Sequence, residues 1–293
     1  MDNATTLQTI QLSDEELRLI LYLTKLTDFP WLDEAALDPM LSDEQQAYGM
    51  MVAERALRSR KLARLNEDGA LRIREDLLRL IGICAYAESS LYLTQILLPE
   101  SVGVRFAVHQ NGNERVFYQQ PQPALHQFGR LGDWDEVIDG FVQRLGWPQN
   151  GESELDDALL VPADLLATVR AEAFEDREIA YDQLVAAGTP DPPAERLIDF
   201  LSKPHQLSVF QQIRRLGEEL HLQAVTLLYT KEAQWLAVEV ASDNDRHHYR
   251  LQPISAAERN RYLTEWITDD IQRPTPSPHP PSLGPNAYGR LES

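Results

Sequence analysis

The sequence contains a single cysteine, Cys84, among its 293 residues. One cysteine can form neither an internal disulfide nor a cysteine-rich zinc site, so a reducing compartment is expected, with Cys84 as a small buried side chain. No run approaches the ~18 consecutive apolar residues that a membrane helix needs. The first eleven residues lack the basic and apolar regions of a secretory signal. These absences predict a cytoplasmic protein with no membrane partner.

Basic side chains are also scarce, because 27 lysines and arginines stand against 46 aspartates and glutamates, which gives a formal net charge of -19. Clustered lysine and arginine supply most of the affinity for nucleic-acid phosphates, so a nucleic-acid partner is disfavoured. The deficit is uneven. Residues 1–53 sum to -8 and residues 133–202 to -13, whereas residues 54–79 sum to +3 and residues 80–132 are neutral. This contrast favours a carrier with acidic helical regions and a protein-binding face.

The usual signatures of catalysis and cofactor binding are missing. The sequence has no phosphate loop, no dinucleotide fingerprint, no His-Glu-x-x-His and no Gly-x-Ser-x-Gly. Adjacent carboxylates such as Asp156 and Asp157 are expected by chance in so acidic a chain. We therefore predict a protein that is not an enzyme and has no cofactor.

Histidines give no metal-binding pattern. His247 and His248 are neighbours in a predicted loop-to-strand junction, where successive side chains point to opposite faces, so we predict no metal site. The remaining histidines in or beside predicted strands are expected at polar surface positions: His109, His126, His205 and His221.

The order of helical and strand patterns repeats along the chain. Each half is predicted to contain helices, a strand, a hairpin, a further strand and a closing helix. In the first half Ser13 and Glu16 form a capping-box pattern at a helix start, and Asp68-Gly69 marks a hairpin over 62–73. This order predicts an α+β fold with a central antiparallel sheet, flanked by helical bundles, in two pseudo-symmetric halves. The predicted boundaries are 1–149 and 150–270, followed by a disordered Pro-rich tail over 271–293.

The basic segment offers an alternative function. Helix, helix, hairpin and helix in that order are typical of a winged-helix module, so residues 43–73 are a candidate DNA-binding region of a transcriptional regulator. The other interpretation is a solvated helix face beside a structural hairpin, favoured by the acidic flank. The candidate DNA-binding residues are Arg55, Arg58, Arg60, Lys61 and Arg64.

The whole-chain order of elements resembles the EspG family of chaperones associated with type VII (ESX) secretion. The resemblance covers residues 12–268 and includes the Leu-Ser-Asp-Glu-Glu-Leu helix start at 12–17, the 62–69 hairpin and the Leu-Gln-Pro-Ile-Ser-Ala-Ala-Glu segment at 251–258. It implies a central antiparallel sheet between two helical bundles, no enzymatic activity, and a cytosolic protein that covers an apolar surface of a secretion substrate.

The resemblance also implies a partner surface made of one hairpin and the second helical bundle. Aromatic and aliphatic anchors within a polar rim suit protein recognition, although alternation along a strand also places some of them in the core. The sequence leaves the partner's identity and the oligomeric state open. The candidate partner-binding residues are Phe106, Val108, Phe117 and Tyr118, or their counterparts Leu228, Trp235 and Val238.

Overall fold

The computed structural model describes residues 9–27, 29–30, 42–98, 102–149, 158–241 and 247–268. The predicted tail at 271–293 lies outside the described residues, as do residues 150–157. The first half contains β1 (Thr9–Ser13), α1 (Asp14–Thr24), α2 (Asp43–Ser59), β2 (Ala63–Leu65), β3 (Leu71–Ile73), α3 (Glu75–Ala85), β4 (Ser89–Leu98), β5 (Val102–Asn111), β6 (Glu114–Gln122), β7 (Leu125–Leu131) and α4 (Trp134–Leu145). The second half contains β8 (Leu159–Pro162), α5 (Ala163–Glu172), α6 (Arg177–Ala186), α7 (Asp191–Leu201), β9 (His205–Leu216), β10 (Glu219–Tyr229), β11 (Gln234–Ala241), β12 (His247–Pro253) and α8 (Ala256–Thr268).

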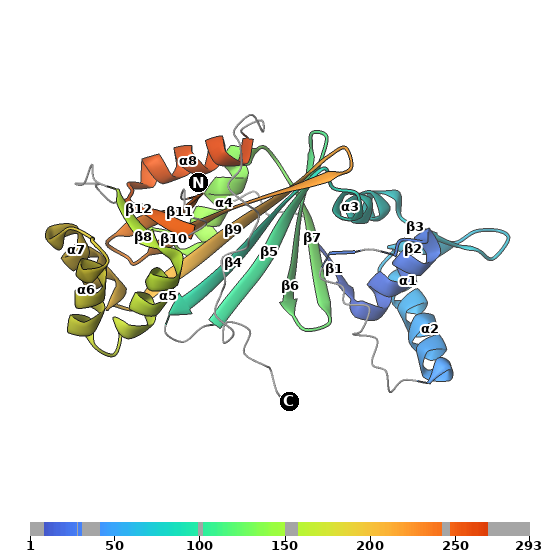
Figure 1. Cartoon of the computed structure of the whole chain (residues 1–293). Helices are drawn as coiled ribbons and strands as arrows, with labels where there is room; N and C mark the ends of the chain where they lie inside the picture. The colour runs from blue at the N-terminus through green and yellow to red at the C-terminus, as the bar shows by residue number, and fades with distance from the viewer. Residues whose placement is uncertain are drawn as a thin grey trace, which may run out of the picture. The chain divides into compact units, whose positions relative to one another are not determined.

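Ten of the described strands form one sheet in the order β1-β7-β6-β5-β4-β9-β10-β11-β12-β8 (Figure 1). The strand pairs with a described register are antiparallel, among them β5 with β6, β10 with β11 and β12 with β8. The predicted α+β class with a large antiparallel sheet is therefore confirmed, and the described residues include eight helices.

The two halves repeat one order of elements. Each begins with a strand, continues with three helices and four sheet strands, and ends with a helix. Read inward from either edge, the sheet presents the initial strand of a half and then its four later strands in reverse order. The separate two-stranded sheet of β2 and β3, inserted between α2 and α3, has no counterpart among the described elements of the second half.

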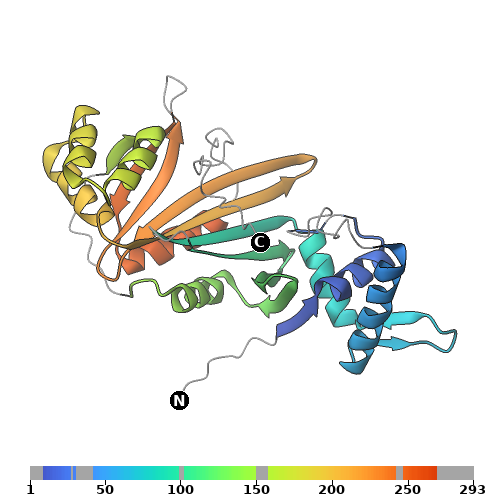
Figure 2. The same ribbon diagram turned by 90° about the horizontal axis from the view of Figure 1, so that it is seen from below.

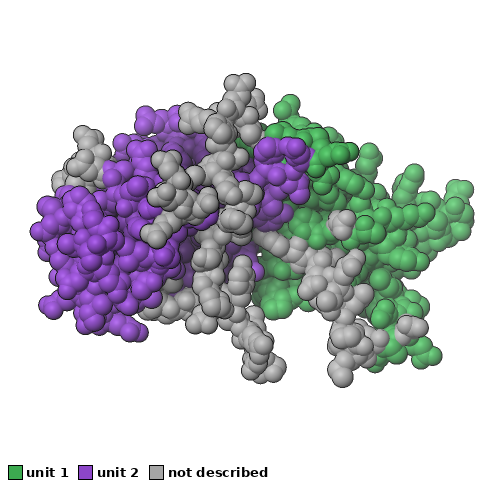
Figure 3. Space-filling view, viewed as in Figure 1, with its two compact units in different colours: residues 1–91, 106–133, 214–218 green, residues 92–105, 134–213, 219–293 purple. Residues whose placement is uncertain are grey.

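The chain forms two compact units (Figure 3). Unit 1 comprises residues 1–91, 106–133 and 214–218, and unit 2 comprises residues 92–105, 134–213 and 219–293. The helix α4, which precedes residue 150, thus belongs to unit 2. The sequence-based boundary at 149 concerns the repeated order of elements rather than compactness, and it stays a prediction.

Each unit buries helices against strands. In unit 1 a cluster of leucine and isoleucine side chains from α1, α2 and α3 packs with Val116, Tyr118 and Phe128 of β6 and β7. In unit 2 apolar residues of α5, α6 and α7 pack with Trp235 and Leu251 of β11 and β12. Figure 2 shows α5, α6 and α7 gathered beside β8, and the β2–β3 hairpin extending from the helices of unit 1.

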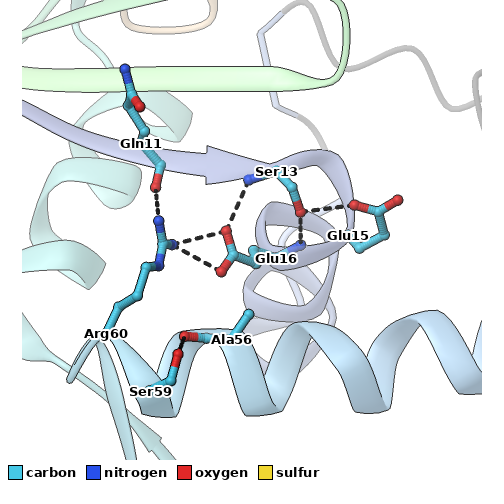
Figure 4. A network of polar contacts seen from close by, with 7 residues as sticks. All are labelled: Gln11, Ser13, Glu15, Glu16, Ala56, Ser59 and Arg60. Carbon is cyan, nitrogen blue, oxygen red and sulfur yellow. Dashed lines mark hydrogen bonds and ion pairs between the residues drawn. The ribbon is translucent and has the colours of Figure 1, made fainter.

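A buried carboxylate joins three elements of unit 1 (Figure 4). Ser13 and Glu16 form the predicted capping box at the start of α1, with the Glu16 carboxylate accepting from the Ser13 backbone N–H. The Glu16 side chain is only 6% exposed, and Arg60 at the end of α2 donates to both of its oxygens at 2.8 and 2.9 Å. Arg60 also donates to the carbonyl of Gln11 in β1 at 2.8 Å. One guanidinium therefore holds the end of α2 to β1 and to the start of α1.

The end of α2 is closed by a backbone motif that usually contains glycine. Lys61 follows the helix with a left-handed φ of 59°. Its N–H donates to the carbonyl of Arg58, and the N–H of Leu62 donates to the carbonyl of Leu57, which is the bond pattern of a Schellman motif. Leu57 and Leu62 are both buried, so their contact fixes the direction in which the chain enters β2.

We predict that Arg60→Ala lowers the free energy of unfolding by about 2 kcal/mol, because it leaves the Glu16 carboxylate buried without its cation. Arg58→Ala is the matched control, since its ion pair with Glu54 is exposed and lies within one helix, and it should cost less than about 0.5 kcal/mol. Urea unfolding of both variants measures the difference. Equal losses would contradict the role assigned to Arg60.

Candidate partner-binding surfaces

The predicted partner residues of the first half lie in unit 1 and are buried. Phe106 and Val108 on β5, and Phe117 and Tyr118 on β6, are at most 3% exposed. Val108 is directly opposite Phe117, and the Phe106 and Phe117 rings pack with centroids 5.6 Å apart. Their side chains thus pack inside the protein's own core, and a contact with a partner stays a prediction.

Their counterparts in the second half lie on the β10–β11 hairpin of unit 2. Leu228 and Trp235 are opposite each other in register and both are buried. Val238 is half-buried, with Arg250 of β12 opposite it. Of the seven predicted partner residues, Val238 is the one whose side chain reaches the surface.

The five candidate DNA-binding residues do not all lie on one surface. Arg60 is engaged by Glu16 and has a structural role, while Arg55 lies exposed on α2. Arg58, Lys61 and Arg64 line a common groove in unit 1, although Arg58 also pairs with Glu54 at 3.0 Å.

That groove has a volume of about 1020 Å³ and is formed where the end of α1, the end of α2, the β2–β3 hairpin and the start of α3 meet. Two further arginines that sequence reasoning missed, Arg72 and Arg74, belong to its lining, which therefore contains five cations and one carboxylate, Glu75. Arg74 also pairs with Asp76 at 2.5 Å, outside the lining. The apolar part of the lining consists of Leu23, Ala63, Leu71, Ile73 and Leu78. We call this set of residues the basic groove.

The exposed face of α2 is apolar for two turns before its basic end. Tyr48, Met51 and Val52 follow one another at helical spacing and are 63%, 48% and 46% exposed. A helix that reads DNA would present polar or basic side chains there. The composition of this face therefore suits contact with protein better than contact with a phosphate backbone.

Three histidines correct the expectation of surface positions, because His109, His126 and His205 are at most 1% exposed. Ser90 is 2.8 Å from Nδ1 of His109, and His205 Nδ1 is 2.8 Å from the carbonyl of Lys203. Burial lowers the pKa of His109 to about 4 and also lowers the pKa of His205. Both rings are therefore neutral at pH 7.

A hydrogen-bonded chain of tyrosine, histidine and aspartate occurs in unit 1. His126 contacts the Tyr118 hydroxyl at 2.9 Å through Nδ1 and the Asp14 carboxylate at 2.5 Å through Nε2. Desolvation lowers the pKa of His126, and the Asp14 carboxylate opposes that shift. The Tyr118 ring stacks on Phe128 and is fully buried, so no substrate reaches its hydroxyl. These contacts join β6 and β7 to the start of α1, so their role is structural.

The remaining titratable groups were candidates for a metal site. No group of three histidine, cysteine, aspartate or glutamate side chains is placed to hold a metal ion within the described ranges. His247 instead contacts Glu239 across the β11–β12 pair at 2.6 Å. Cys84 is buried as expected, and desolvation raises the pKa of its thiol. Among the described helices, none is long and apolar enough to cross a membrane.

A buried arginine in unit 2 links α8 to residues of two other segments. Arg259 on α8 is 1% exposed and donates to the Pro148 carbonyl and to the Gln234 side chain, each at 2.9 Å. Its guanidinium also lies 5.0 Å from the centre of the Trp147 ring. Burial lowers the pKa of Arg259 to about 10, so the group stays cationic at pH 7.

The architecture defines the protein as having an EspG-like α+β fold. No protein-family model and no curated protein matches the sequence. Among solved structures, the chain is similar to the Mycobacterium tuberculosis type VII secretion system chaperone EspG5, solved in complex with a PE25–PPE41 dimer. The match has a TM-score of 0.63 and 11% identity, and it covers 89% of this chain and 96% of that chain. At this identity the likeness establishes the fold.

We predict that the protein loses stability as pH falls from 6.5 towards 4. A buried neutral histidine gains its proton first in the unfolded state, so each costs up to about 1.4 kcal/mol per pH unit between 6.5 and its lower folded pKa. Urea unfolding at several pH values should show a shallower loss for His109→Gln than for the wild type. His221→Gln, at a half-buried position, is the control and should keep the wild-type slope. Identical slopes in all three proteins would contradict the prediction.

Proposed function

We propose that this protein is a cytoplasmic, non-enzymatic chaperone or adaptor that binds another protein and shields an apolar surface of it, in the manner of the EspG proteins of type VII secretion. One observation carries the proposal, namely a shared fold over 89% of the chain with a chaperone that was solved together with its protein partner. By the same analogy, the partner of this chain is a secreted protein.

Two features of the described residues support a binding function over catalysis. The hydrogen-bonded chain of Asp14, His126 and Tyr118 has the residue types of a proton relay, but its hydroxyl is closed off from solvent. Exposed apolar side chains, by contrast, gather on α2 at Tyr48, Met51 and Val52. A carrier needs accessible apolar surface more than it needs an enclosed titratable site.

The proposal keeps the pseudo-symmetric halves 1–149 and 150–270 as the organisation of the carrier. Within the predicted hairpin surfaces, the six buried side chains stabilise the strands as part of the core. Val238 is the position through which the β10–β11 hairpin contacts the partner. Arg250, exposed opposite Val238, belongs to the polar rim of that contact.

We predict that Val238→Arg lowers recovery of the secreted partner by about tenfold, since a charge replaces an aliphatic contact at the surface. The measurement is affinity capture from the native host, with the captured proteins identified by mass spectrometry. The unfolding temperature of the variant should stay near that of the wild type, because the position is half-buried.

Leu97→Arg is the matched control, because Leu97 on β4 is an exposed aliphatic residue of the same unit that lies outside the predicted surfaces. It should leave recovery of the partner unchanged. Capture by the wild-type protein that recovers no secretion substrate, or a genome neighbourhood without secretion genes, would contradict the proposed function.

A further inference from the structure

The β2–β3 hairpin is an addition that the repeated architecture does not require. In the second half, α6 and α7 occupy the positions that α2 and α3 occupy in the first, and residues 187–190 alone connect them. In the first half, the corresponding connection contains both strands of the hairpin. The basic groove is built on this addition, because five of its lining residues belong to β2 and β3 and three more, Arg74, Glu75 and Leu78, come after β3.

The hairpin holds two like charges side by side. In the register of β2 and β3, Arg64 is directly opposite Arg72, and both are exposed. Like charges at directly opposed positions destabilise a strand pair. Among the described residues, no carboxylate forms an ion pair with Arg64, Arg72 or the neighbouring Lys61. The pair of arginines lowers the stability of a hairpin that the repeated architecture does not require, which indicates a functional reason for both charges.

Lys61 adds a second local cost at the same place. It takes a left-handed backbone conformation in which glycine is usual, and its side chain lines the basic groove beside Arg58. Glycine would close α2 with less strain but would remove a cation from the groove. The residue choice therefore favours the charge of the groove over the stability of the helix end.

We propose that the basic groove binds an acidic peptide segment of a partner protein, in which aspartate or glutamate side chains alternate with aliphatic ones. Lys61, Arg64 and Arg72 complement the carboxylates, because Arg58 and Arg74 of the lining already pair with Glu54 and Asp76. Contact for the aliphatic side chains comes from Leu23, Leu71 and Leu78, the apolar lining residues that are at least partly exposed. Arginine forks match carboxylates in a bidentate geometry, which gives the pairs both strength and orientation.

The lining favours an acidic peptide over a nucleic acid. None of the twelve lining residues is aromatic, so bases find no stacking surface there. Residues 1–53, which lie in the same unit, sum to -8 and repel a long polyanion. A short acidic segment needs only the local field, because salt screens charges beyond about 8 Å at physiological ionic strength.

This binding site goes beyond the proposed function and is separate from the Val238 surface. The test uses the full-length protein and fluorescence anisotropy with a labelled synthetic peptide of glutamate, aspartate and leucine. A peptide with glutamine and asparagine in place of the acids is the neutral probe. The acidic probe should bind at low salt and weaken as salt increases, whereas the neutral probe should bind at least about tenfold more weakly.

Arg64→Glu separates binding from folding. The new carboxylate faces Arg72, so a repulsive pair becomes an attractive one and the unfolding temperature should not fall. Affinity for the acidic probe should nevertheless decrease by about fivefold or more, and further in the variant Arg64→Glu/Arg72→Glu. Arg196→Glu on α7, an exposed arginine outside the groove, is the control and should leave the affinity unchanged.

Several results would overturn the proposal. They are equal affinity for the acidic and neutral probes, an unchanged affinity in Arg64→Glu, or tighter binding of an oligonucleotide of the same charge than of the acidic peptide. A self-association of the protein that disappears in Arg64→Glu, without any binding of the acidic probe, would assign the groove to a second copy of this chain instead. Loss of the Val238-dependent partner with intact binding of the acidic probe would bear on the proposed function alone.

Discussion

The structure of unit 1 depends on the pairing of one buried carboxylate with one guanidinium. Glu16 lies among the leucines of α1, where an uncompensated charge would be costly, and Arg60 supplies the compensation from 44 residues further along the chain. The same guanidinium binds the carbonyl of Gln11, so the strand β1, the start of α1 and the end of α2 meet at one point. The direction of α2 then decides where the hairpin and its groove begin.

The repeated halves and the inserted hairpin differ in charge. The repeated strands and helices supply a broad sheet with helices packed on it, and charge is distributed accordingly, with acidic helical segments and a neutral stretch from 80 to 132. The hairpin reverses the sign of charge locally, since its groove has five cations in a chain of net charge -19. The basic groove thus differs in charge from the acidic helical segments of the repeated architecture.

Much of the fold was predictable because its signals are local. The capping box of Ser13 and Glu16 and the Asp68-Gly69 turn depend on residues close in sequence, and the structure contains both elements. The sequence analysis does not predict the edge strands β1 and β8, because segments of five and four residues are too short for their pattern to stand out beside a helix start. The buried histidines were missed for a different reason. The local pattern does not show that His126 is enclosed beside Asp14, which is 112 residues away in the sequence, or that His109 is enclosed beside Ser90 of another strand.

In the candidate sites too, local features were predictable and contacts between distant residues were not. Charge alone identifies the basic segment, and Arg72 lies in the hairpin that the Asp68-Gly69 turn predicts. Its position opposite Arg64 depends on a loop of three residues, 67–69, which the dipeptide does not specify. The structural use of Arg60 was not predictable, since it rests on a partner in a distant helix. Residue type along a strand does not tell a core position from a surface one. Tyr118, Leu228 and Trp235 are buried in clusters with helices from other parts of the chain, which the strand pattern alone does not reveal.

The position of β1 at the edge of the sheet also sets an order of events during synthesis of the chain. Thr9 pairs with Gly129 and Leu12 with His126, so β1 leaves the ribosome more than a hundred residues before its partner strand is synthesised. Pairing over such a separation closes a long loop, and that closure slows folding. Until β7 emerges, the apolar side of α1 has no sheet to cover it, and the nascent protein depends on α2 and α3 to hide it. The element that begins unit 1 in the sequence is thus among the last to be fixed in it.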